Sequence, residues 1–348
     1  MTALASAHSI RTTPRLHCAL CGQLGEPLYT RLQDRLFGVL GTWRLGKCSN
    51  PRCGLIWMDP MPLAEDISNA YHSYYTHDDR AAAGPEGPVK RAYHAIKRGY
   101  LASRYGYCIR SGRDVWSRLG WLLYLVPIRR GKVDNEARLL TSRPGGKLLD
   151  VGCGSGAWLS DMRDLGWEVR GLDFDAAAIA IAIGRGLQVD HGQLETQRYP
   201  DESFDAITLN HVIEHVPDPF ATMAECCRIL KRGGQLIVFT PNSASLGHQL
   251  FKESWRGLEP PRHLHLFCPN SMGAGLSRAG FTHFEVRTMN SAYVWQHSLD
   301  LWAGHADARQ HRRFRLKVWA LLLTLIEQAM LVLRPDAGEC LAVVATKS

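Results

Sequence analysis

The chain has 348 residues, of which 45% are hydrophobic and 21% charged, and a formal net charge of +8. This length and hydrophobic share exclude a disordered protein and predict one large domain with smaller attachments. The basic residues are scattered, so the charge favours a moderately basic enzyme over a dedicated binder of anionic partners. The first residues, MTALASAHSIRTTPRL, contain no apolar stretch of signal-peptide length, so we expect a cytoplasmic protein.

Two pairs of cysteines follow this polar start. Two residues separate Cys18 from Cys21, four residues separate Cys48 from Cys53, and a glycine follows each pair. This spacing is typical of a zinc ribbon, and four thiolates suit a closed tetrahedral site that stabilises a small module without catalysing a reaction. The alternative is four unconnected buried cysteines.

The next segment is rich in tyrosine and arginine. It has loop signals at AAAGPEGPVK and an apolar patch at GWLLYLVPIRR, and it predicts a helical connector. From Lys147 onward, short apolar strands alternate with helical stretches, which indicates a doubly wound α/β domain whose ligand binds at the carboxyl ends of the first strands. The predicted strands are KLLDVG, EVRGLDF, GLQVDHG, DAITLN, QLIVFT, THFEVRT and CLAVVATK, with helices that begin near Ala157, Asp175, Pro219 and Asn270.

The segment LLDVGCGSGAW places a glycine-rich turn between the first strand and the first helix of this domain. Gly152-x-Gly154-x-x-Ala157 satisfies the dinucleotide fingerprint, which alone is a weak signal. Asp150 lies two residues before the first glycine, where a carboxylate repels a pyrophosphate and attracts a cation. This charge argument places a nicotinamide dehydrogenase last among the hypotheses.

A second carboxylate, Asp173, ends the second strand, where it can accept both hydroxyls of an unmodified ribose. Asp150 and Asp173 together describe a ligand with a ribose and a positive charge but no phosphate, and S-adenosylmethionine fits this description. Taken singly, Asp150 is also explained as a turn-capping residue and Asp173 as a helix N-cap.

LLDVGCGSG, GLDFD, FDAITLNHVIEHVPDP and RILKRGGQLIVFTPN resemble, in order and interval, the motifs of class I S-adenosylmethionine-dependent methyltransferases. The cysteine-rich start, CGLIWMDPMP, TPNSASLGHQLF and WRGLEPPRHLHLF resemble a bacterial subgroup with an N-terminal zinc-binding module, often found in sugar, polysaccharide or secondary-metabolite pathways. The resemblance implies a Rossmann-like fold with a helical insertion before the last strand. The predicted parts are a tail (1–16), a zinc-ribbon module (17–70), a helical connector (71–135), a methyltransferase core (136–289), a helical insertion (290–335) and the last core strand (336–348).

The resemblance also implies roles for individual residues of the cofactor site. Gly152, Gly154 and Gly156 would line the loop under the methionine part of the cofactor, Asp150 would bind its amino group, and Asp173, next to Phe174, would hold the ribose. The family usually has an acid that meets the adenine amino group, and this chain has Gln193 there, whose amide oxygen can accept the same bond. Leu194 would cover the adenine face.

Methyl transfer requires an aligned acceptor and, for a hydroxyl, removal of its proton. The end of the fourth strand carries NHVIEH, so Asn210 and His211 are predicted to lie beside the reactive methyl, with His211 as the general base. Glu214 and His215 have two interpretations: buried support of the loop, or a divalent-metal site together with His211, because the spacing resembles the Glu-x-x-Glu-His of some metal-dependent methyltransferases.

A second histidine cluster, PRHLHLF, follows the fifth strand. Trp255, Arg262 and His263 offer an aromatic wall, an anion clamp and an acid-base group to an acceptor, or they attach the loop to the core. The insertion carries QHRRFRLKVWALLLTLIEQAMLVL, which fits either burial of an apolar helix against the patch Trp121–Val126 or a peripheral contact with an anionic membrane. Burial is the favoured interpretation.

The leading hypothesis is therefore an S-adenosylmethionine-dependent methyltransferase that acts on a hydroxyl, or less favourably on nitrogen or carbon, of a sugar, a lipid-linked glycan or another small metabolite. An RNA methyltransferase with a zinc-ribbon substrate module is a second hypothesis, but we do not expect a nucleic-acid partner because the ribbon lacks interleaved aromatic and basic residues. A non-catalytic binding module built on a cofactor fold is the third.

Overall fold

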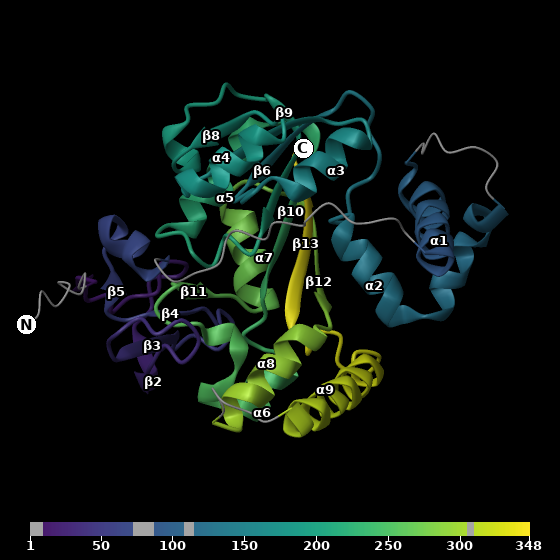
Figure 1. Ribbon diagram of the computed structural model, residues 1–348. Helices are drawn as coiled ribbons and strands as arrows, with labels where there is room; N and C mark the ends of the chain where they lie inside the picture. Colours follow the sequence, from purple (N-terminus) through teal and green to yellow (C-terminus); the bar gives the residue numbers. More distant parts are fainter. Residues whose placement is uncertain (1–9, 72–86, 108–114, 305–309) are drawn as a thin grey trace, which may run out of the picture. The chain divides into compact units, whose positions relative to one another are not determined.

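The structure is a computed structural model that describes residues 10–71, 87–107, 115–304 and 310–348 (Figure 1). The predicted tail, connector and insertion therefore lie partly outside the described residues, as does most of the predicted loop AAAGPEGPVK. The chain divides into two compact units. The first unit comprises Met1–Tyr75, His211–Ala224 and Val238–Val343, and the second comprises Thr76–Asn210, Glu225–Ile237 and Val344–Ser348.

A seven-stranded sheet has the order β12-β13-β10-β9-β6-β7-β8. β6 pairs in parallel with β7 and β9, and β7 pairs in parallel with β8. The backbone hydrogen bonds of Lys347 with Gly233 and Gly234, and of Asn242 with Glu339, give opposite directions to β13 and β10. The strands are β6 (Lys147–Val151), β7 (Glu168–Asp173), β8 (Val189–His191), β9 (Phe204–Asn210), β10 (Leu230–Pro241), β12 (His283–Met289) and β13 (Cys340–Thr346).

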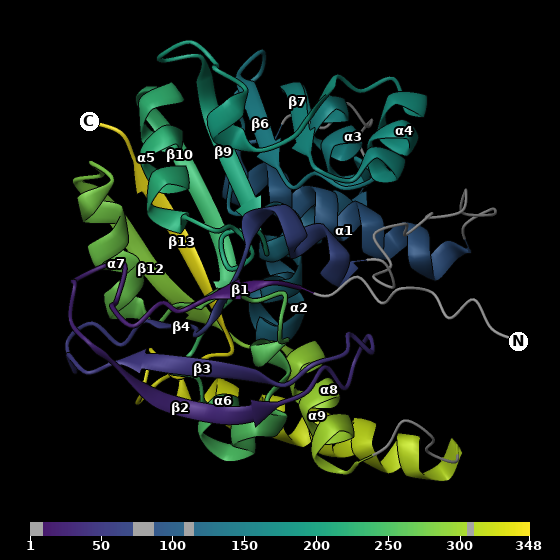
Figure 2. The ribbon, with the colours of Figure 1, turned by 90° about the vertical axis from the view of Figure 1, so that its left-hand side faces the viewer.

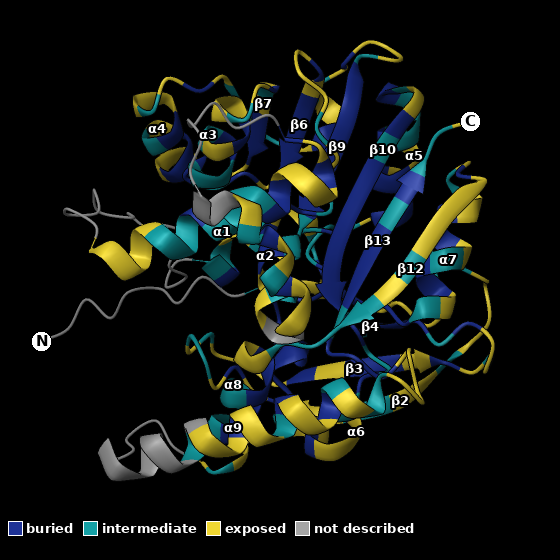
Figure 3. Ribbon diagram, turned by 90° about the vertical axis from the view of Figure 1, so that its right-hand side faces the viewer, coloured by how far each residue is buried: buried dark blue, intermediate teal, exposed yellow. Residues whose placement is uncertain are grey.

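The strands in the middle of this sheet read as nearly continuous apolar runs, as expected where both faces of a sheet are covered. The first six residues of β9 are buried, and so are four of the five residues of β6 (Figure 3). The connecting and flanking helices are α3 (Ala157–Asp164), α4 (Ala176–Gly184), η3 (Leu194–Thr196), α5 (Pro219–Ile229), α6 (Leu246–Phe251), η4 (Lys252–Ser254), η5 (Arg256–Leu258) and α7 (Pro269–Arg278). The seven predicted strands and four predicted helix starts are confirmed. Most bounds agree within one residue, but β10 begins five residues before the predicted QLIVFT and β8 begins three residues after the start of GLQVDHG.

The second unit also contains the helices of the predicted connector, which are α1 (Pro88–Tyr105), η2 (Val115–Leu125) and α2 (Pro127–Glu136). α1 begins with proline at its first position and ends at Gly106 in the left-handed conformation, with φ 74°, which is the usual asymmetry of helix ends. The hydroxyl groups of Tyr100 and Tyr105 both donate to Asp134 at 2.7 Å, which ties α1 to α2.

A small antiparallel sheet in the first unit has the order β11-β4-β3-β2 (Figure 2). Its strands are β2 (Gly25–Leu32), β3 (Trp43–Cys48), β4 (Ile56–Met58) and β11 (His265–Leu266). β1 (Thr12–Thr13) pairs with β5 (Met61–Pro62), and η1 (Ala64–Tyr71) follows. The sheet thus joins the cysteine-rich start of the chain to β11, more than 200 positions further on.

The segment before β13 forms α8 (Ala292–Trp302) and α9 (Gln310–Met330). Within its own unit much of α9 is exposed, because Trp319, Leu322, Leu325 and Ile326 are each more than 40% exposed (Figure 3). The patch Trp121–Val126 belongs to the other unit and is also largely exposed, so burial of α9 against it stays a prediction. Within the described residues, no helix combines the length and apolar composition needed to cross a membrane.

Candidate cofactor and acceptor sites

The glycine-rich turn connects β6 to α3 in the second unit. Gly152, Gly154 and Gly156 have φ angles of 71°, 53° and 71°, a left-handed conformation that side chains with a Cβ adopt at a cost. A Cβ on Gly156 would lie 2.4 Å from Leu187 Cδ1, whereas a Cβ on Gly154 would meet no atom within 4 Å. Gly156 is thus required by packing, and Gly154 borders open space where a ligand can approach the backbone.

Asp173 ends β7 and fixes the turn. Its Oδ2 atom accepts the backbone N–H of Gly154 at 2.7 Å, and its Oδ1 atom accepts that of Asp175 at 2.9 Å. The side chain is buried, and burial raises its pKa against the effect of these hydrogen bonds. The backbone N–H of Phe174 bonds to the same carboxylate, and the remaining acceptor capacity of its oxygens is available to a ligand hydroxyl. Asp175, rather than Asp173, is the N-cap of α4.

Asp150 lies on β6 opposite Thr208 of β9. It is 1% exposed, and its Oδ1 atom accepts hydrogen bonds from Thr208 Oγ1 at 2.6 Å and from the guanidinium of Arg138. Burial raises the pKa of Asp150, while Arg138 and Thr208 oppose this effect. Arg138 itself stacks on Trp158, with its Cζ atom 3.6 Å from the ring centroid.

The other oxygen of Asp150, Oδ2, is buried and has no hydrogen-bond partner. An unsatisfied buried acceptor costs about 1–3 kcal/mol, so such an atom usually marks a place for a missing donor. An ammonium group is a donor that would satisfy Oδ2 and also favour the ionised carboxylate. The residues of the turn therefore fit a ligand with an amino group and a ribose.

The remaining predicted cofactor residues follow β7, β8 and β9 in the same unit. Phe174 is 48% exposed and Gln193 is exposed, so both side chains are available to a ligand. Leu194 is 2% exposed at the start of η3, and Asn210 is half-buried at the end of β9.

His211 begins the loop after β9 and belongs to the first unit. It is a non-glycine residue with φ 56°, a strained conformation of a kind that tends to occur at functional sites. Its Nδ1 atom lies 3.1 Å from Oε1 of Glu214, and Thr240 Oγ1 donates to Oε2 of Glu214 at 2.9 Å. The His211 side chain is 47% exposed and that of Glu214 is 0% exposed. A carboxylate that holds Nδ1–H leaves Nε2 of His211 as the atom that can accept a proton.

The second histidine cluster differs from the acceptor wall that the sequence suggested. Trp255, Arg262 and His263 are all 5% exposed or less. Arg262 donates to Asp34 at 2.9 Å and to Glu259 at 3.0 Å, so its guanidinium attaches the loop to the core and is not an anion clamp. Burial lowers the pKa of His263 to about 4. The buried ring is also out of contact with an exposed acceptor. Both observations argue against the predicted acid-base role of His263.

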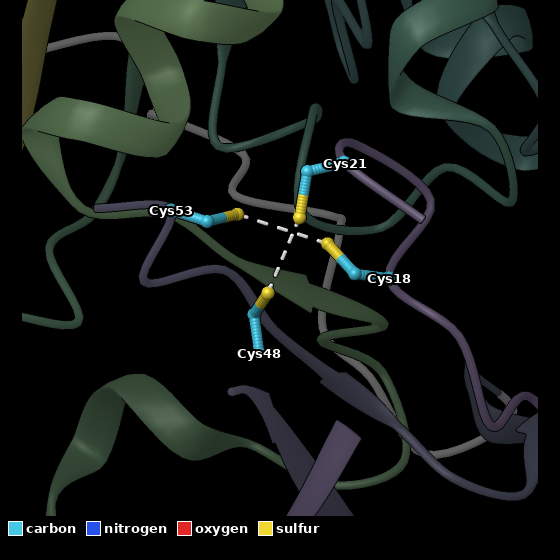
Figure 4. Close-up of side chains that lie close together, drawn as sticks. All are labelled: Cys18, Cys21, Cys48 and Cys53. Carbon is cyan, nitrogen blue, oxygen red and sulfur yellow. Dashed lines mark hydrogen bonds between the residues drawn. The ribbon is translucent and has the colours of Figure 1, made fainter. Parts of the chain in front are cut away.

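Cys18, Cys21, Cys48 and Cys53 direct their sulfur atoms towards a common centre (Figure 4). The Sγ atoms of Cys18 and Cys53 are 3.7 Å apart, and those of Cys21 and Cys48 are 3.4 Å apart. A tetrahedral zinc ion with Zn–S bonds of about 2.3 Å places its ligands about 3.8 Å apart, so the four thiols fit this ion. The cluster is compatible with a zinc ribbon.

Three residues of the cofactor site were not predicted from the sequence: Arg138, Thr208 and Trp158. Arg138 precedes the core strands by nine residues and belongs to no motif, so nothing in the local pattern indicates that it pairs with Asp150. Thr208 occupies a position of β9 between apolar residues, and a polar residue at such a position is the one signal that was available.

Comparison with known proteins identifies part of the chain. Residues 128–286 match the family model described as a methyltransferase domain. The chain is 35% identical over 123 residues to a protein named ubiquinone biosynthesis O-methyltransferase from Pseudomonas aeruginosa, a match that covers 33% of this chain and 51% of the relative. A protein of the same name from Hahella chejuensis is 35% identical over 136 residues, which is 37% of this chain and 56% of the relative. The chain thus spans about half the length of these relatives.

Among solved structures, the chain is similar to an S-adenosylmethionine dependent methyltransferase from Mesorhizobium loti, with 19% identity and a TM-score of 0.44 over 62% of this chain and 98% of that chain. A SAM dependent methyltransferase from Archaeoglobus fulgidus has 18% identity and a TM-score of 0.42, over 64% of this chain and 94% of that one.

Proposed function

We propose that the protein transfers a methyl group from S-adenosylmethionine to a hydroxyl of a small-molecule acceptor, because residues 128–286 match a methyltransferase-domain family model and similar proteins are named O-methyltransferases. The observation that carries the proposal is the unsatisfied Oδ2 atom of Asp150, buried at the end of β6. A dinucleotide has a pyrophosphate at this place, which a carboxylate would repel.

The residues that would hold the cofactor are Asp150, Asp173 and the glycines of the turn. Oδ2 of Asp150 would accept the amino group, the free lone pairs of Asp173 would accept ribose hydroxyls, and the backbone at Gly154 would approach the ligand. Phe174, Gln193, Leu194 and Asn210 would complete the contacts. When bound, S-adenosylmethionine supplies an electrophilic methyl on a cationic sulfur.

His211 would remove the proton of the acceptor hydroxyl. Glu214 supports this role because its buried carboxylate holds Nδ1 and favours the protonated ring that forms during the reaction. A base supported in this way is useful for a hydroxyl acceptor, whose proton must leave. The names of the relatives concern O-methylation and agree with this assignment. A sugar or lipid-linked glycan as the acceptor rests on the motif resemblance alone.

We also propose a structural zinc ion on the four cysteines. Their sulfur separations support this assignment, and a site with four protein ligands has no open position for chemistry.

α9 supports a peripheral contact with an anionic membrane. Most of its described large apolar side chains are exposed, whereas Thr324 and Glu327 are buried beside Ala320, an arrangement unlike that of an ordinary surface helix. Four basic residues, Arg312, Arg313, Arg315 and Lys317, precede the apolar stretch in the same helix. A basic and apolar helix suits the interface of an anionic bilayer. The acceptor would then be a lipid-linked molecule.

Vesicle sedimentation tests the membrane contact. We expect the protein to sediment with phosphatidylglycerol vesicles and to lose this binding in the double variant Leu322→Glu/Leu325→Glu. Leu40, which is 80% exposed and distant in sequence, provides the control variant Leu40→Glu. Equal binding to phosphatidylcholine vesicles, or a dimer in light scattering that the double variant disrupts, would contradict the proposal.

Calorimetric titration with S-adenosylhomocysteine tests the function itself. We expect saturable binding by the zinc-loaded protein, its loss in Asp150→Ala and Asp173→Ala variants that remain folded, and no binding of a nicotinamide cofactor. Methylation of hydroxyl-bearing acceptors, measured with a radiolabelled methyl donor, then identifies the acceptor. Binding without transfer to any acceptor would favour the non-catalytic module.

A further inference from the structure

Two histidines and a glutamate that are distant in sequence come together in the first unit. Glu214 and His215 lie in the loop after β9, and His263 lies just before β11. One ligand atom from each of these three side chains lies within 4.8 Å of the others, and Glu214 and His263 are buried. The imidazole rings of His215 and His263 have centroids 4.7 Å apart. The cluster is separate from the four cysteines and contains no sulfur.

A backbone carbonyl group lies beside one nitrogen of each imidazole. Nδ1 of His215 lies 3.0 Å from the carbonyl oxygen of Arg262, and Nδ1 of His263 lies 2.7 Å from that of Gly257. A carbonyl oxygen only accepts, so Nδ1 of His263 is a donor and its Nε2 carries a lone pair in the neutral ring. Nδ1 of His215 also lies 3.0 Å from the Tyr71 hydroxyl, and in the tautomer that donates to Arg262 its Nε2 carries a lone pair as well. This is the arrangement by which proteins orient histidine ligands towards a metal ion.

Glu214 supplies an anionic donor to the same place. Oε1 is within hydrogen-bond distance of His211 and Oε2 accepts from Thr240, so each oxygen keeps one lone pair. The carboxylate therefore has one acceptor position on each oxygen that a metal ion could use.

The charges around the cluster leave the three donors available. Glu259 lies beside the cluster, with Oε2 3.6 Å from Nε2 of His263, and it is paired with Arg256 and Arg262. Arg262 also pairs with Asp34. The positive charges of the two arginines equal the negative charges of Glu259 and Asp34. The cluster itself therefore contains two imidazoles and one carboxylate that no arginine neutralises.

We propose that Glu214, His215 and His263 bind a divalent transition-metal ion. Two imidazoles and a carboxylate are a common ligand set for zinc, manganese or iron. Bonds of about 2.0–2.1 Å place tetrahedral ligands about 3.3–3.5 Å apart, so the three donors would have to close by about 1 Å or slightly more on binding. Three protein ligands leave a position for an oxygen ligand.

A titration with Mn²⁺ distinguishes binding at this site from binding at the four cysteines, because thiolates prefer zinc whereas a site of nitrogen and oxygen ligands accepts Mn²⁺. The protein, with zinc on its cysteines, is titrated with Mn²⁺ and the free ion is followed by electron paramagnetic resonance. A calorimetric titration with Zn²⁺ is run in parallel. We expect about one additional ion per chain, and a loss of affinity of more than about 100-fold in His215→Gln and His263→Gln, since loss of outer partners alone costs up to that factor.

His248 provides the matched control. It is a buried histidine of the same unit whose Nδ1 lies 2.7 Å from the carbonyl of Ser243 and whose Nε2 lies 3.0 Å from the Tyr29 hydroxyl, so both nitrogens already have partners. The His248→Gln variant should bind the ion as the wild type does. Circular dichroism and thermal unfolding establish that each variant is folded.

A wild-type measurement covers the case in which the histidine variants do not fold. Electron spin echo modulation of the bound Mn²⁺ should show two imidazole nitrogens. The proposal is overturned if the wild type binds neither additional Mn²⁺ nor additional Zn²⁺, if folded His215→Gln and His263→Gln variants bind as the wild type does, or if bound Mn²⁺ shows no nitrogen. Because metal binding is measured without turnover, a protein that binds the ion but no S-adenosylhomocysteine would refute the proposed function and leave this inference standing.

Discussion

The Nδ1 atom of His211 lies 3.1 Å from the Oε1 atom of Glu214, so a half-exposed imidazole is supported by a carboxylate that solvent does not reach. The backbone N–H of His211 also donates to the carbonyl of Phe239 at 2.9 Å, which holds the residue in its left-handed conformation. The ring can exchange protons with solvent or an acceptor, while its orientation is fixed from within.

His211→Gln should lower kcat by about 10²–10⁴-fold, the usual contribution of a general base, and leave S-adenosylhomocysteine binding unchanged. Glu214→Gln should lower kcat by a smaller factor, because an amide can still hold the ring but no longer carries the negative charge that stabilises the imidazolium formed in the reaction. Steady-state kinetics measure both effects. Full activity of His211→Gln would exclude His211 as the base.

Arg138→Met should reduce the free energy of unfolding by about 3–5 kcal/mol, because it leaves the buried carboxylate of Asp150 unpaired. Arg287, whose ion pair with Glu285 is more than half exposed, is the matched control, and Arg287→Met should cost less than about 1 kcal/mol. Urea unfolding measures the two values. Equal costs would mean that burial of the Arg138 pair has no energetic consequence.

Gly156→Ala and Gly154→Ala should separate packing from ligand binding. Both variants place a Cβ at positive φ, which costs about 1–2 kcal/mol of stability. Only the Cβ at position 156 also meets Leu187 and Ala182. Gly156→Ala should therefore be the less stable variant in thermal unfolding. Gly154→Ala should lose more affinity for S-adenosylhomocysteine than stability, and unchanged affinity would show that this face of the turn does not meet the cofactor.

Removal of the thiolates should release zinc and destabilise the first unit. We expect a thiol-reactive mercurial to release about one zinc ion per chain from the wild type. The Cys48→Ser variant should contain no such zinc and should have a lower Tm than the wild type. Cys227, a half-buried cysteine outside the cluster, gives the control Cys227→Ser, which should keep its zinc. Retention of mercurial-released zinc by Cys48→Ser would contradict the four-cysteine assignment.

The stability of the protein should fall with rising pH between about 4.5 and 8. Burial, and then repulsion by Glu339, raises the pKa of Glu327 from 4.5 to about 8, and burial raises that of Glu339 to about 7. In this window the folded chain retains protons that the unfolded chain has released, so the free energy of unfolding decreases as pH rises and levels off above about pH 8.

Unfolding of Glu327→Gln tests this dependence. Trp295 Nε1 and the backbone N–H of Glu339 donate to the two oxygens of Glu327, so an amide satisfies only one of them and the variant should be less stable overall. The decline of stability with pH should nevertheless be shallower than in the wild type. Glu285→Gln, at a 55% exposed site, should leave the slope unchanged. An identical slope in Glu327→Gln would assign the dependence to other groups.

The elements of the sheet could be predicted because local signals fix them. The apolar runs of β6, β9 and β10 and the three glycines before α3 are consecutive in the sequence, and turn chemistry fixes where strand and helix meet. Asp150 and Asp173 could be placed at strand ends for the same reason. Their roles towards a cofactor remain proposals.

Long-range ion pairs could not be predicted in this way. The partner of Asp150 is Arg138, and the partners of Arg262 are Glu259 and Asp34, which is 228 positions away. Sequence periodicity does not indicate such a pair. The sequence alone was therefore compatible with an Arg262 that binds an anionic ligand and with one that attaches the loop to the core. The orientation of α9 could not be predicted for a related reason. Its apolar residues surround most of the helix. The burial of Glu327 depends on a hydrogen bond from Trp295 of α8, which is distant in sequence.

β11 has only two residues, and its hydrogen-bonding partner is β4 of the cysteine-bearing sheet. A shortened protein that began at residue 128, where the match to the methyltransferase domain begins, would keep His265 and Leu266 but lose the strand that pairs with them. Their backbone groups would form an open edge beside a buried apolar surface, which is a template for intermolecular pairing. We expect such a fragment to aggregate, so the smallest soluble form of this protein should retain its first 70 residues.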